Sequence, residues 1–289
     1  MGRAIIWFEG CARPICRTPR RLRWAGVILA IGLPLVSYAA GWLLILCATG
    51  VHDWLGRGVG VLLAATTLAW RDLMGHVSTV AQAIETGALS QARQAVARIV
   101  GRDTETLTEA EVVRATVETI AESASDGVIA PLLYLVLGGA PLALAYKAVS
   151  TLDSMVGHHD EHYRDFGWAS AKLDDVANFI PARVTAGLFV LAGWLVFRRI
   201  DKTRQAWALL LRDGMKHPSP NSGRPEAAMA GALGVQLGGV NRYGGVASAR
   251  PHMGEAHEPL APCHIARAQR IVTAAYLLAI VCSIGWLWL

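Results

Sequence analysis

Long apolar runs alternate with polar stretches along this chain, and the length of each run indicates what it forms. Residues 24–48 are apolar over enough length to cross about 30 Å of hydrocarbon as one helix. Residues 59–70 form a shorter run that is marginal alone, and the turn-forming stretch 50–58 separates the two. The pattern predicts a helical hairpin, with further spans later in the chain at 184–197 and 271–289.

The apolar run 128–148 is interrupted at its middle by Gly138-Gly139-Ala140-Pro141, where adjacent Gly and Pro favour a turn over a straight helix. Each half has about ten residues, too few to cross a bilayer alone. A re-entrant hairpin would return residue 150 to the side that the run left. A kinked single crossing is equally compatible with the sequence, so both interpretations stay open.

Residues 72–126 have a different character, because apolar residues recur there at helical spacing with polar residues between them. This pattern predicts two or three amphipathic helices outside the bilayer or along its surface. Thr108 followed by Glu111 fits a capping box, which marks the start of one helix. The basic, Gly- and Pro-rich stretch 198–270 is expected in the cytoplasm, where positively charged loops concentrate.

Composition strengthens the membrane interpretation. The chain is 53% hydrophobic and 17% charged, whereas a soluble domain is about a quarter charged. The arginines that flank the first hairpin would place both of its ends in the cytoplasm; they are Arg17, Arg20, Arg21, Arg23 and Arg71. We therefore predict an all-α, multi-pass integral protein of the cell (inner) membrane, with amphipathic cytoplasmic helices and a broken or re-entrant helix.

Charge and cysteine content narrow the function classes. The net charge is +5, but Arg and Lys do not cluster with aromatic residues on one face, so we expect no nucleic-acid binding. None of the five cysteines forms a CxxC pair, and two lie inside apolar runs, so we expect free thiols. The basic N-terminus leads into a run too long for a signal peptide, which predicts a retained anchor.

The sharpest local pattern is a row of carboxylates in VETIAESASDG. Glu118, Glu122 and Asp126 recur every four residues, which places them on one face of a helix. Like charges at this spacing destabilise a helix by a few tenths of a kcal/mol, so the row has no stabilising purpose of its own. A Mg²⁺ ion would convert the repulsion into ligation. A solvated acidic face remains the other interpretation.

Two further polar clusters adjoin apolar runs. In LDDVANFIPAR, Asp174 and Asp175 precede Asn178 and Arg183 at a membrane boundary, where ionisable residues serve either as snorkelling anchors or in function. The stretch HHDEH at 158–162 has two histidines at helical spacing but lacks the HExxH order of zinc enzymes, so we interpret it as a polar loop.

Three short turns could bind phosphate through backbone amides, with Arg102 or Lys216 close by in the sequence. They are GRDT at 101–104, SPNSG at 219–223 and LGGVNRYGG at 237–245. Each alone is more typical of an ordinary turn.

Taken together and in this order, the motifs resemble the CbiB/CobD family of cobalamin biosynthesis, the adenosylcobinamide-phosphate synthases. The matching sequence is VGRDTETL, RATVETIAESASDGVIAPLLYLVLGGAPLALAYKAVSTLDSMVG, YRDFGWASAKLDDVANFIPAR, and SPNSG with AGALGVQLGG. Ser123 and Ser150 stand where the family usually has Asn, so the donor–acceptor pair of an amide is lost there. Family members tend to begin with another apolar helix, so we expect that either a first span is missing here or the start site is misassigned.

The resemblance implies a membrane enzyme that joins the propionate carboxylate of adenosylcobyric acid to aminopropanol or its phosphate, giving adenosylcobinamide or its phosphate. Its partners would be the corrinoid, the amino-alcohol and the lipid bilayer, and the ligase class implies ATP and Mg²⁺. The chain would divide into an N-terminal basic segment and hairpin at 1–71, a catalytic region at 72–270 and a transmembrane helix at 271–289. A membrane corrinoid transporter or binding protein is the alternative, because broken helices and charge within the membrane suit transporters.

The resemblance also implies residue roles. The expected catalytic residues are Glu118, Glu122, Asp126, Asp153, Asp174 and Asp175, of which the first three are the expected Mg²⁺ ligands. The expected substrate- or phosphate-binding residues are Arg102, Asp103, Thr104, Asn178, Arg183, Ser219, Asn221, Gly223, Gly238 and Gly239. We further expect residues 150–176 on the cytoplasmic side, where ATP is available.

Overall fold

The computed structural model describes residues 1–158 and 160–288. The chain forms two compact units, one made of residues 1–68 and 130–179 and the other of residues 69–129 and 180–289. The all-α prediction is confirmed, and among the described residues four helical stretches are long and apolar enough to cross a membrane. They are Pro19–Val51, Glu109–Val156, Phe179–Phe197 and Cys263–Leu287.

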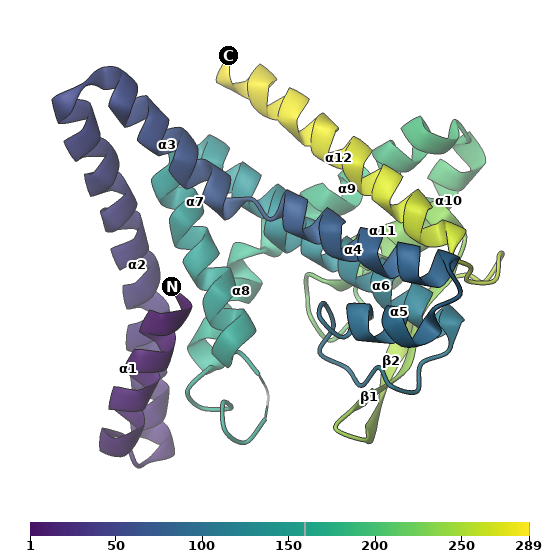
Figure 1. The fold of residues 1–289 in the computed structure, drawn as a ribbon, viewed down its shortest axis with the longest axis horizontal. Coiled ribbons are helices and arrows are strands. Elements are labelled where there is room, and N and C mark those ends of the chain that lie inside the picture. Colours follow the sequence, from purple (N-terminus) through teal and green to yellow (C-terminus); the bar gives the residue numbers. More distant parts are fainter. Residues whose placement is uncertain (159, 289) are drawn as a thin grey trace. The chain divides into compact units, whose positions relative to one another are not determined.

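The first unit is helical throughout its regular structure. Its elements are α1 (Gly2–Ile15), α2 (Pro19–Val51), α3 (Asp53–Thr67), α7 (Ala130–Val156) and α8 (Trp168–Ala177). The predicted N-terminal hairpin is α2 and α3, which run in opposite directions from the turn at His52 (Figure 1). The His52 ring accepts a hydrogen bond from the backbone N–H of Trp54 and so caps α3. α2 packs against α7, and Leu29, Leu152 and Phe166 are buried together.

The break in α7 resolves the alternative that the sequence left open. Gly138 and Gly139 have non-helical backbone angles, and Gly139 has φ of 69°. The rings of Tyr134 and Tyr146 stack with their centroids 4.8 Å apart, although twelve positions of straight helix would separate them by about 18 Å. The chain therefore reverses at the two glycines, and the run is a helical hairpin.

The C-terminal end of α8 joins both arms of this hairpin. The Tyr134 hydroxyl donates to the carbonyl of Ala177 at 2.9 Å, and the Tyr146 hydroxyl donates to Asn178 Oδ1 at 2.8 Å. Asn178 in turn donates to Asp174 Oδ2 at 2.9 Å. Because each arm bonds to the same short segment, the polar side chains at 174–178 fix the closed hairpin.

The second unit is built around α6 (Glu109–Ala124), which continues into the π-helical turn η1 (Ser125–Ile129). The predicted capping box is confirmed, because Thr108 and Glu111 exchange both of its hydrogen bonds. α6 contacts α4, α5, α11, α12 and β1. The surrounding elements are α4 (Trp70–Glu85), α5 (Leu89–Val96), α9 (Phe179–Phe197), α10 (Ile200–Asp213), α11 (Gly223–Leu233) and α12 (Cys263–Leu287).

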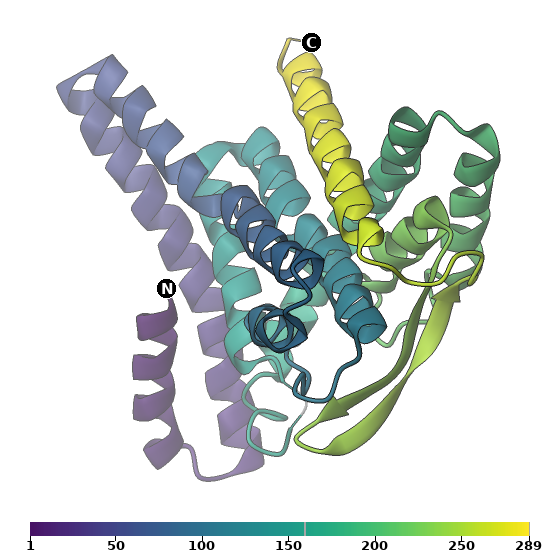
Figure 2. The ribbon, with the colours of Figure 1, turned by 45° about the vertical axis from the view of Figure 1, so that its right-hand side comes forward.

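One element of this unit is absent from the sequence-based expectation. β1 (Gln236–Tyr243) and β2 (Val246–Gly254) pair antiparallel as a long two-stranded ribbon (Figure 2). The register shifts between Leu237 and Gly239, which makes a bulge at Gly238, where φ is 84°. The glycine turn predicted in LGGVNRYGG is thus the strand, bulge and tip of a hairpin.

Candidate functional site

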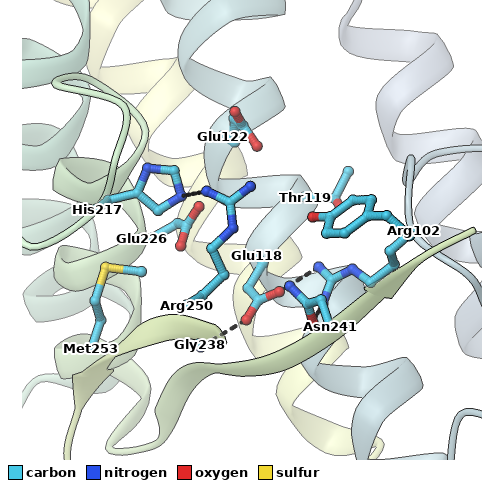
Figure 3. Close-up of a pocket in the computed structure, with 11 residues that line it drawn as sticks. Arg102, Glu118, Thr119, Glu122, His217, Glu226, Gly238, Asn241, Arg250 and Met253 are labelled. Carbon is cyan, nitrogen blue, oxygen red and sulfur yellow. Dashed lines mark hydrogen bonds and ion pairs between the residues drawn. The ribbon is translucent and has the colours of Figure 1, made fainter. Parts of the chain in front are cut away.

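A polar cavity of about 120 Å³ lies within the second unit (Figure 3). Its walls come from α6, α11, β1, β2 and the loops before α6 and α11. The lining residues are Arg102, Glu118, Thr119, Glu122, His217, Glu226, Gly238, Asn241, Tyr243, Arg250 and Met253. Most of these side chains are charged or polar, and several are buried, so the fold has gathered ionisable groups away from solvent.

On one wall, Glu118 is fully engaged by protein donors. One oxygen pairs with the Arg102 guanidinium, and the other accepts the backbone N–H of Gly238 at 2.8 Å. Arg102 also donates to Asn241 Oδ1 at 2.6 Å. Both side chains of the ion pair are less than a tenth exposed. Glu118 therefore connects α6 to the loop at 102 and to β1.

Arg114, one turn before Glu118 on α6, binds the same strand. Its guanidinium donates to the carbonyls of Gly238 and Val240 and to Asn241 Oδ1. A side chain at Gly239 would collide with this guanidinium. This is a second reason for glycine at the position, in addition to its positive φ. We call Arg102, Arg114, Glu118 and Asn241 the α6–β1 clamp, because together they fix the strand that forms one cavity wall.

Glu122 faces the opposite wall and the loop SPNSG. Ser222 Oγ donates to Glu122 Oε1 at 2.8 Å. Ser219 Oγ accepts the backbone N–H groups of Asn221 and Ser222, each at 3.3 Å, which closes the loop before α11. Gly223 is the first residue of α11, and a side chain there would collide with His217. The predicted phosphate loop thus lies beside the cavity.

Glu226 on α11 is the most deeply buried carboxyl group of the cavity, at 5% exposed. Its carboxyl has no hydrogen-bond partner among the described residues. Burial raises its pKa well above the usual value, and the nearby Glu122 and Glu118 carboxylates raise it further. Burial therefore favours the neutral, protonated form of this carboxyl group.

His217 and Arg250 complete the wall next to Glu226. Burial lowers the pKa of His217, so its ring is neutral at pH 7. Its Nδ1 accepts the backbone N–H of Ser219 at 3.0 Å, and its Nε2 lies 3.4 Å from Arg250. Figure 3 shows the Arg250 guanidinium reaching from β2 between His217 and Glu118.

The structure brings together several of the residues predicted from sequence. Arg102, Glu118, Glu122 and Gly238 line the cavity, and the loop with Ser219, Asn221 and Gly223 adjoins it. The other predicted residues of this unit are Asp103 and Thr104 in the loop before α6, Asp126 in η1, Arg183 in α9 and Gly239 in β1. Asp103 closes the hairpin tip, because its carboxylate accepts the N–H groups of Gly244 and Gly245 at 3.0 and 2.7 Å.

The other predicted residues belong to the first unit. Asn178 is buried and, with Asp174, bonds to the α7 hairpin. Asp175 pairs with Lys172 at 3.0 Å, and Asp153 is half-buried near the end of α7. In the HHDEH stretch, His162 lies 3.4 Å from Glu9, while His159 lies outside the described residues.

Within residues 1–158 and 160–288, no three His, Cys, Asp or Glu side chains are grouped so as to hold a metal ion. Both Glu118 oxygens accept hydrogen bonds from the protein, whereas Glu122 presents its carboxylate at the cavity edge. Mg²⁺ binding by the row of three carboxylates stays a prediction.

Sequence reasoning missed six polar residues of the cavity: Thr119, His217, Glu226, Asn241, Tyr243 and Arg250. They come from α6, the loop before α11, α11, β1 and β2, and nothing in their local spacing connects them. Glu226 carried one signal, because it is the only acid in the small-residue helix GRPEAAMAGAL. A lone acid in a helix that is otherwise buried needs a partner.

Comparison with known proteins gives consistent matches. The family described as CobD/Cbib protein matches residues 1–272. Cobalamin biosynthesis protein CobD of Geobacter metallireducens is 53% identical over 238 residues, which cover 82% of this chain and 74% of that protein. The CobD of Klebsiella pneumoniae is 44% identical over 285 residues, covering 99% and 88%. Cobalamin biosynthesis protein CbiB of Salmonella typhi is 41% identical over 287 residues, covering 97% and 87%. No solved structure matches the chain.

Proposed function

We propose that this chain catalyses amide formation as an ATP-dependent ligase. The chain belongs to the CobD/CbiB protein family and so takes part in cobalamin biosynthesis. The carboxylate partner would be the propionate of adenosylcobyric acid, and the amine partner aminopropanol or its phosphate. The product would be adenosylcobinamide or its phosphate. Catalysis would take place at the inner membrane, because the four apolar helical stretches are long enough to cross it.

The observation that carries this proposal is the cavity in the second unit. Its lining includes the carboxyl groups of Glu122 and Glu226, the guanidinium of Arg250 and the neutral imidazole of His217. At about 120 Å³ it is smaller than the pockets that hold drug-sized ligands, which have roughly 300–1,000 Å³. A small amino-alcohol suits this space. The corrin macrocycle does not, so only its propionate arm would reach the cavity.

The chemistry of amide formation explains why such groups are gathered. A carboxylate is a poor acylating agent, since hydroxide would have to leave. Transfer of a phosphoryl group from ATP to the carboxylate gives an acyl phosphate and ADP, and phosphate then leaves when the amine attacks. The amine must lose its proton before it attacks, which requires a carboxylate or imidazole within hydrogen-bond reach. Guanidinium groups stabilise the charge that develops on the phosphate oxygens.

The SPNSG loop is the proposed binding place for the nucleotide phosphates. It lies at the start of α11, where backbone N–H groups favour anions. Arg224 follows the loop directly, and its Nε is buried without a hydrogen-bond partner among the described residues. Mg²⁺ suits this site as an ion held mainly by nucleotide phosphates and water, where it would screen the phosphate charge. Ser222 joins this loop to Glu122, so the nucleotide and the amine would occupy adjoining spaces.

The test is product formation by the purified full-length protein in detergent micelles. Adenosylcobyric acid, ATP and Mg²⁺ are supplied with either aminopropanol phosphate or aminopropanol, and mass spectrometry follows the mass of the amide. We expect an ATP-dependent product with at least one of the two amines. Absence of product with both amines would refute the ligase proposal. Release of ADP rather than AMP would support the acyl phosphate over an acyl adenylate.

A further inference from the structure

The ionisable side chains that line the cavity include more acidic than basic groups once the buried ion pair and the neutral His217 are set aside. Arg102 and Glu118 neutralise each other in a buried ion pair. His217 is neutral because burial lowers its pKa. The remaining ionisable groups are the carboxyl groups of Glu122 and Glu226 and the guanidinium of Arg250. If Glu226 ionises along with Glu122, the lining would carry one surplus negative charge.

Of the three cavity carboxyl groups, Glu226 alone has no hydrogen-bond partner in the described parts of the chain. Glu122 accepts a hydrogen bond from Ser222, and Glu118 accepts two from the protein. The Glu226 carboxyl, 5% exposed, accepts none from the described residues. A buried carboxylate without a partner is strongly unfavourable, since it loses its hydration and gains nothing. Figure 3 shows Glu226 facing the cavity among His217, Arg250 and Glu118, so a partner would come from the ligand that fills this space.

We propose that Glu226 binds the amino group of a small primary amine as its ammonium ion, and so positions the nucleophile for amide formation. This inference rests on the proposed function, because it assigns the amine of that reaction to a residue. An ammonium group is a compact single positive charge with three N–H donors. It therefore matches both the surplus charge and the missing donor.

Other cations fit this space less well. No three His, Cys, Asp or Glu ligands are grouped for a metal ion within the part of the chain that the structure describes. A guanidinium is larger and binds best where two carboxylate oxygens face it in a plane. The raised pKa of Glu226 agrees with an ammonium ligand. Burial disfavours a carboxylate without a compensating positive charge, and an ammonium group would supply that charge.

The experiment compares two ligands that differ only in the amino group. Aminopropanol phosphate and propane-1,2-diol phosphate are titrated separately into wild type, Glu226→Gln and Glu226→Asp by isothermal calorimetry. Glu226→Gln keeps the size of the side chain but loses its charge. We expect it to weaken binding of the amine about 10- to 100-fold, as for loss of a hydrogen bond to a charged group. Binding of the diol phosphate should stay within about twofold, and Glu226→Asp should retain part of the amine affinity.

Steady-state kinetics add a second readout. The KM for the amine should rise in Glu226→Gln while the KM for ATP stays unchanged, and Glu105→Gln, at an exposed loop position, serves as the matched control. If Glu226→Gln weakened the binding of both ligands equally, or of neither, the assignment of Glu226 would be overturned. Failure of wild type to bind the amine would overturn it too. If wild type still forms the amide in those cases, only this inference fails, and the proposed function stands.

Discussion

At the scale of single residues, sequence spacing identified two carboxyl groups that line the cavity but did not distinguish their contacts. Glu118 and Glu122 lie one turn apart on α6, and the spacing alone treats them as equivalent. Their partners come from elsewhere in the chain. Glu118 binds Arg102 and β1, whereas Glu122 binds the loop before α11. The first is held as part of a clamp, and the second is available to a ligand.

We predict that Glu118→Ala destabilises the protein by about 3 kcal/mol, because it leaves the Arg102 charge buried without its partner. Gly238 loses its acceptor in the same variant. The free energy of unfolding by denaturant in detergent measures the effect. Glu105→Ala, at an exposed position in the neighbouring loop, should change it by less than about 0.5 kcal/mol. Equal stability of Glu118→Ala and wild type would show that the clamp does not hold the fold.

A second residue prediction concerns pH. Asp213 is fully buried and accepts from Arg212, from Lys216 and from the backbone N–H of Gly254. The Arg212 hydrogen bonds, above all, lower the pKa of Asp213 in the folded protein. A lowered folded-state pKa stabilises the protein above the unfolded pKa of about 3.9, and this stability is lost as pH falls below that value.

Asp213→Asn should therefore lower the free energy of unfolding by about 2 kcal/mol at pH 7, the typical value for hydrogen bonds to a charged group. The difference in unfolding free energy between the variant and wild type should become smaller as pH falls from about 4 towards 3. Unfolding free energies measured at successive pH values follow both proteins. A difference that stays constant down to pH 3 would be inconsistent with an ionised Asp213 as the source of the stability.

At the scale of elements, features with local causes were predictable. The capping box at Thr108 and the break at Gly138 depend on a few adjacent residues, and both are present. The ribbon of β1 and β2 was not predicted, because two strands alone are marginal and this sequence has glycines in place of a clear alternating pattern. It is held by residues more than 100 positions away, Arg114 on α6 and Asp103 at the tip.

The cavity was only half predictable for the same reason. Its α6 wall could be recognised from the carboxylate row, whereas Glu226, His217 and Arg250 carry no motif that relates them. They meet because α11 packs against α6, and β2 packs against both α11 and β1. Such long-range packing is not encoded in the spacing of any one segment. Whether the chain reverses or only bends at Gly138 was likewise decided by a contact between the two sides of the break, the stacked rings of Tyr134 and Tyr146.

An element-scale prediction tests the turn of α7. Gly139 has φ of 69° and ψ of −170°, a backbone region that is essentially restricted to glycine. Gly139→Ala should destabilise the protein by about 1–3 kcal/mol. Gly75 lies within α4 with open space around it, so Gly75→Ala should be neutral or stabilise by up to about 1 kcal/mol. Thermal unfolding in detergent compares the stabilities of the two variants. Equal changes in stability would exclude backbone strain at Gly139 as the cause of the destabilisation.

At the scale of the whole molecule, the reversal at Gly139 determines which segments share a side of the membrane. α6 carries Glu118 and Glu122 and continues through η1 into the first arm of the hairpin. Because the second arm returns, residue 150 emerges on the side where the first arm began. Amide formation driven by ATP requires the cavity to open to the cytoplasm. On that requirement we predict that the acidic stretch 150–176 is cytoplasmic, although its charge alone would favour the outside.

We predict that a cysteine at Ser154 is accessible only from the cytoplasm. Ser154 is exposed near the end of α7, and the test uses a version in which all five native cysteines are replaced. Ala256, exposed in the basic stretch 198–270, is changed to cysteine in parallel as the reference for the cytoplasmic side. A membrane-impermeant thiol reagent is applied to intact cells with a permeabilised outer membrane and to inverted inner-membrane vesicles. Both cysteines should react in the vesicles and neither in the cells. Labelling of Ser154→Cys in the cells would place residues 150–176 outside, because the first arm would then have crossed the membrane before the chain reached them.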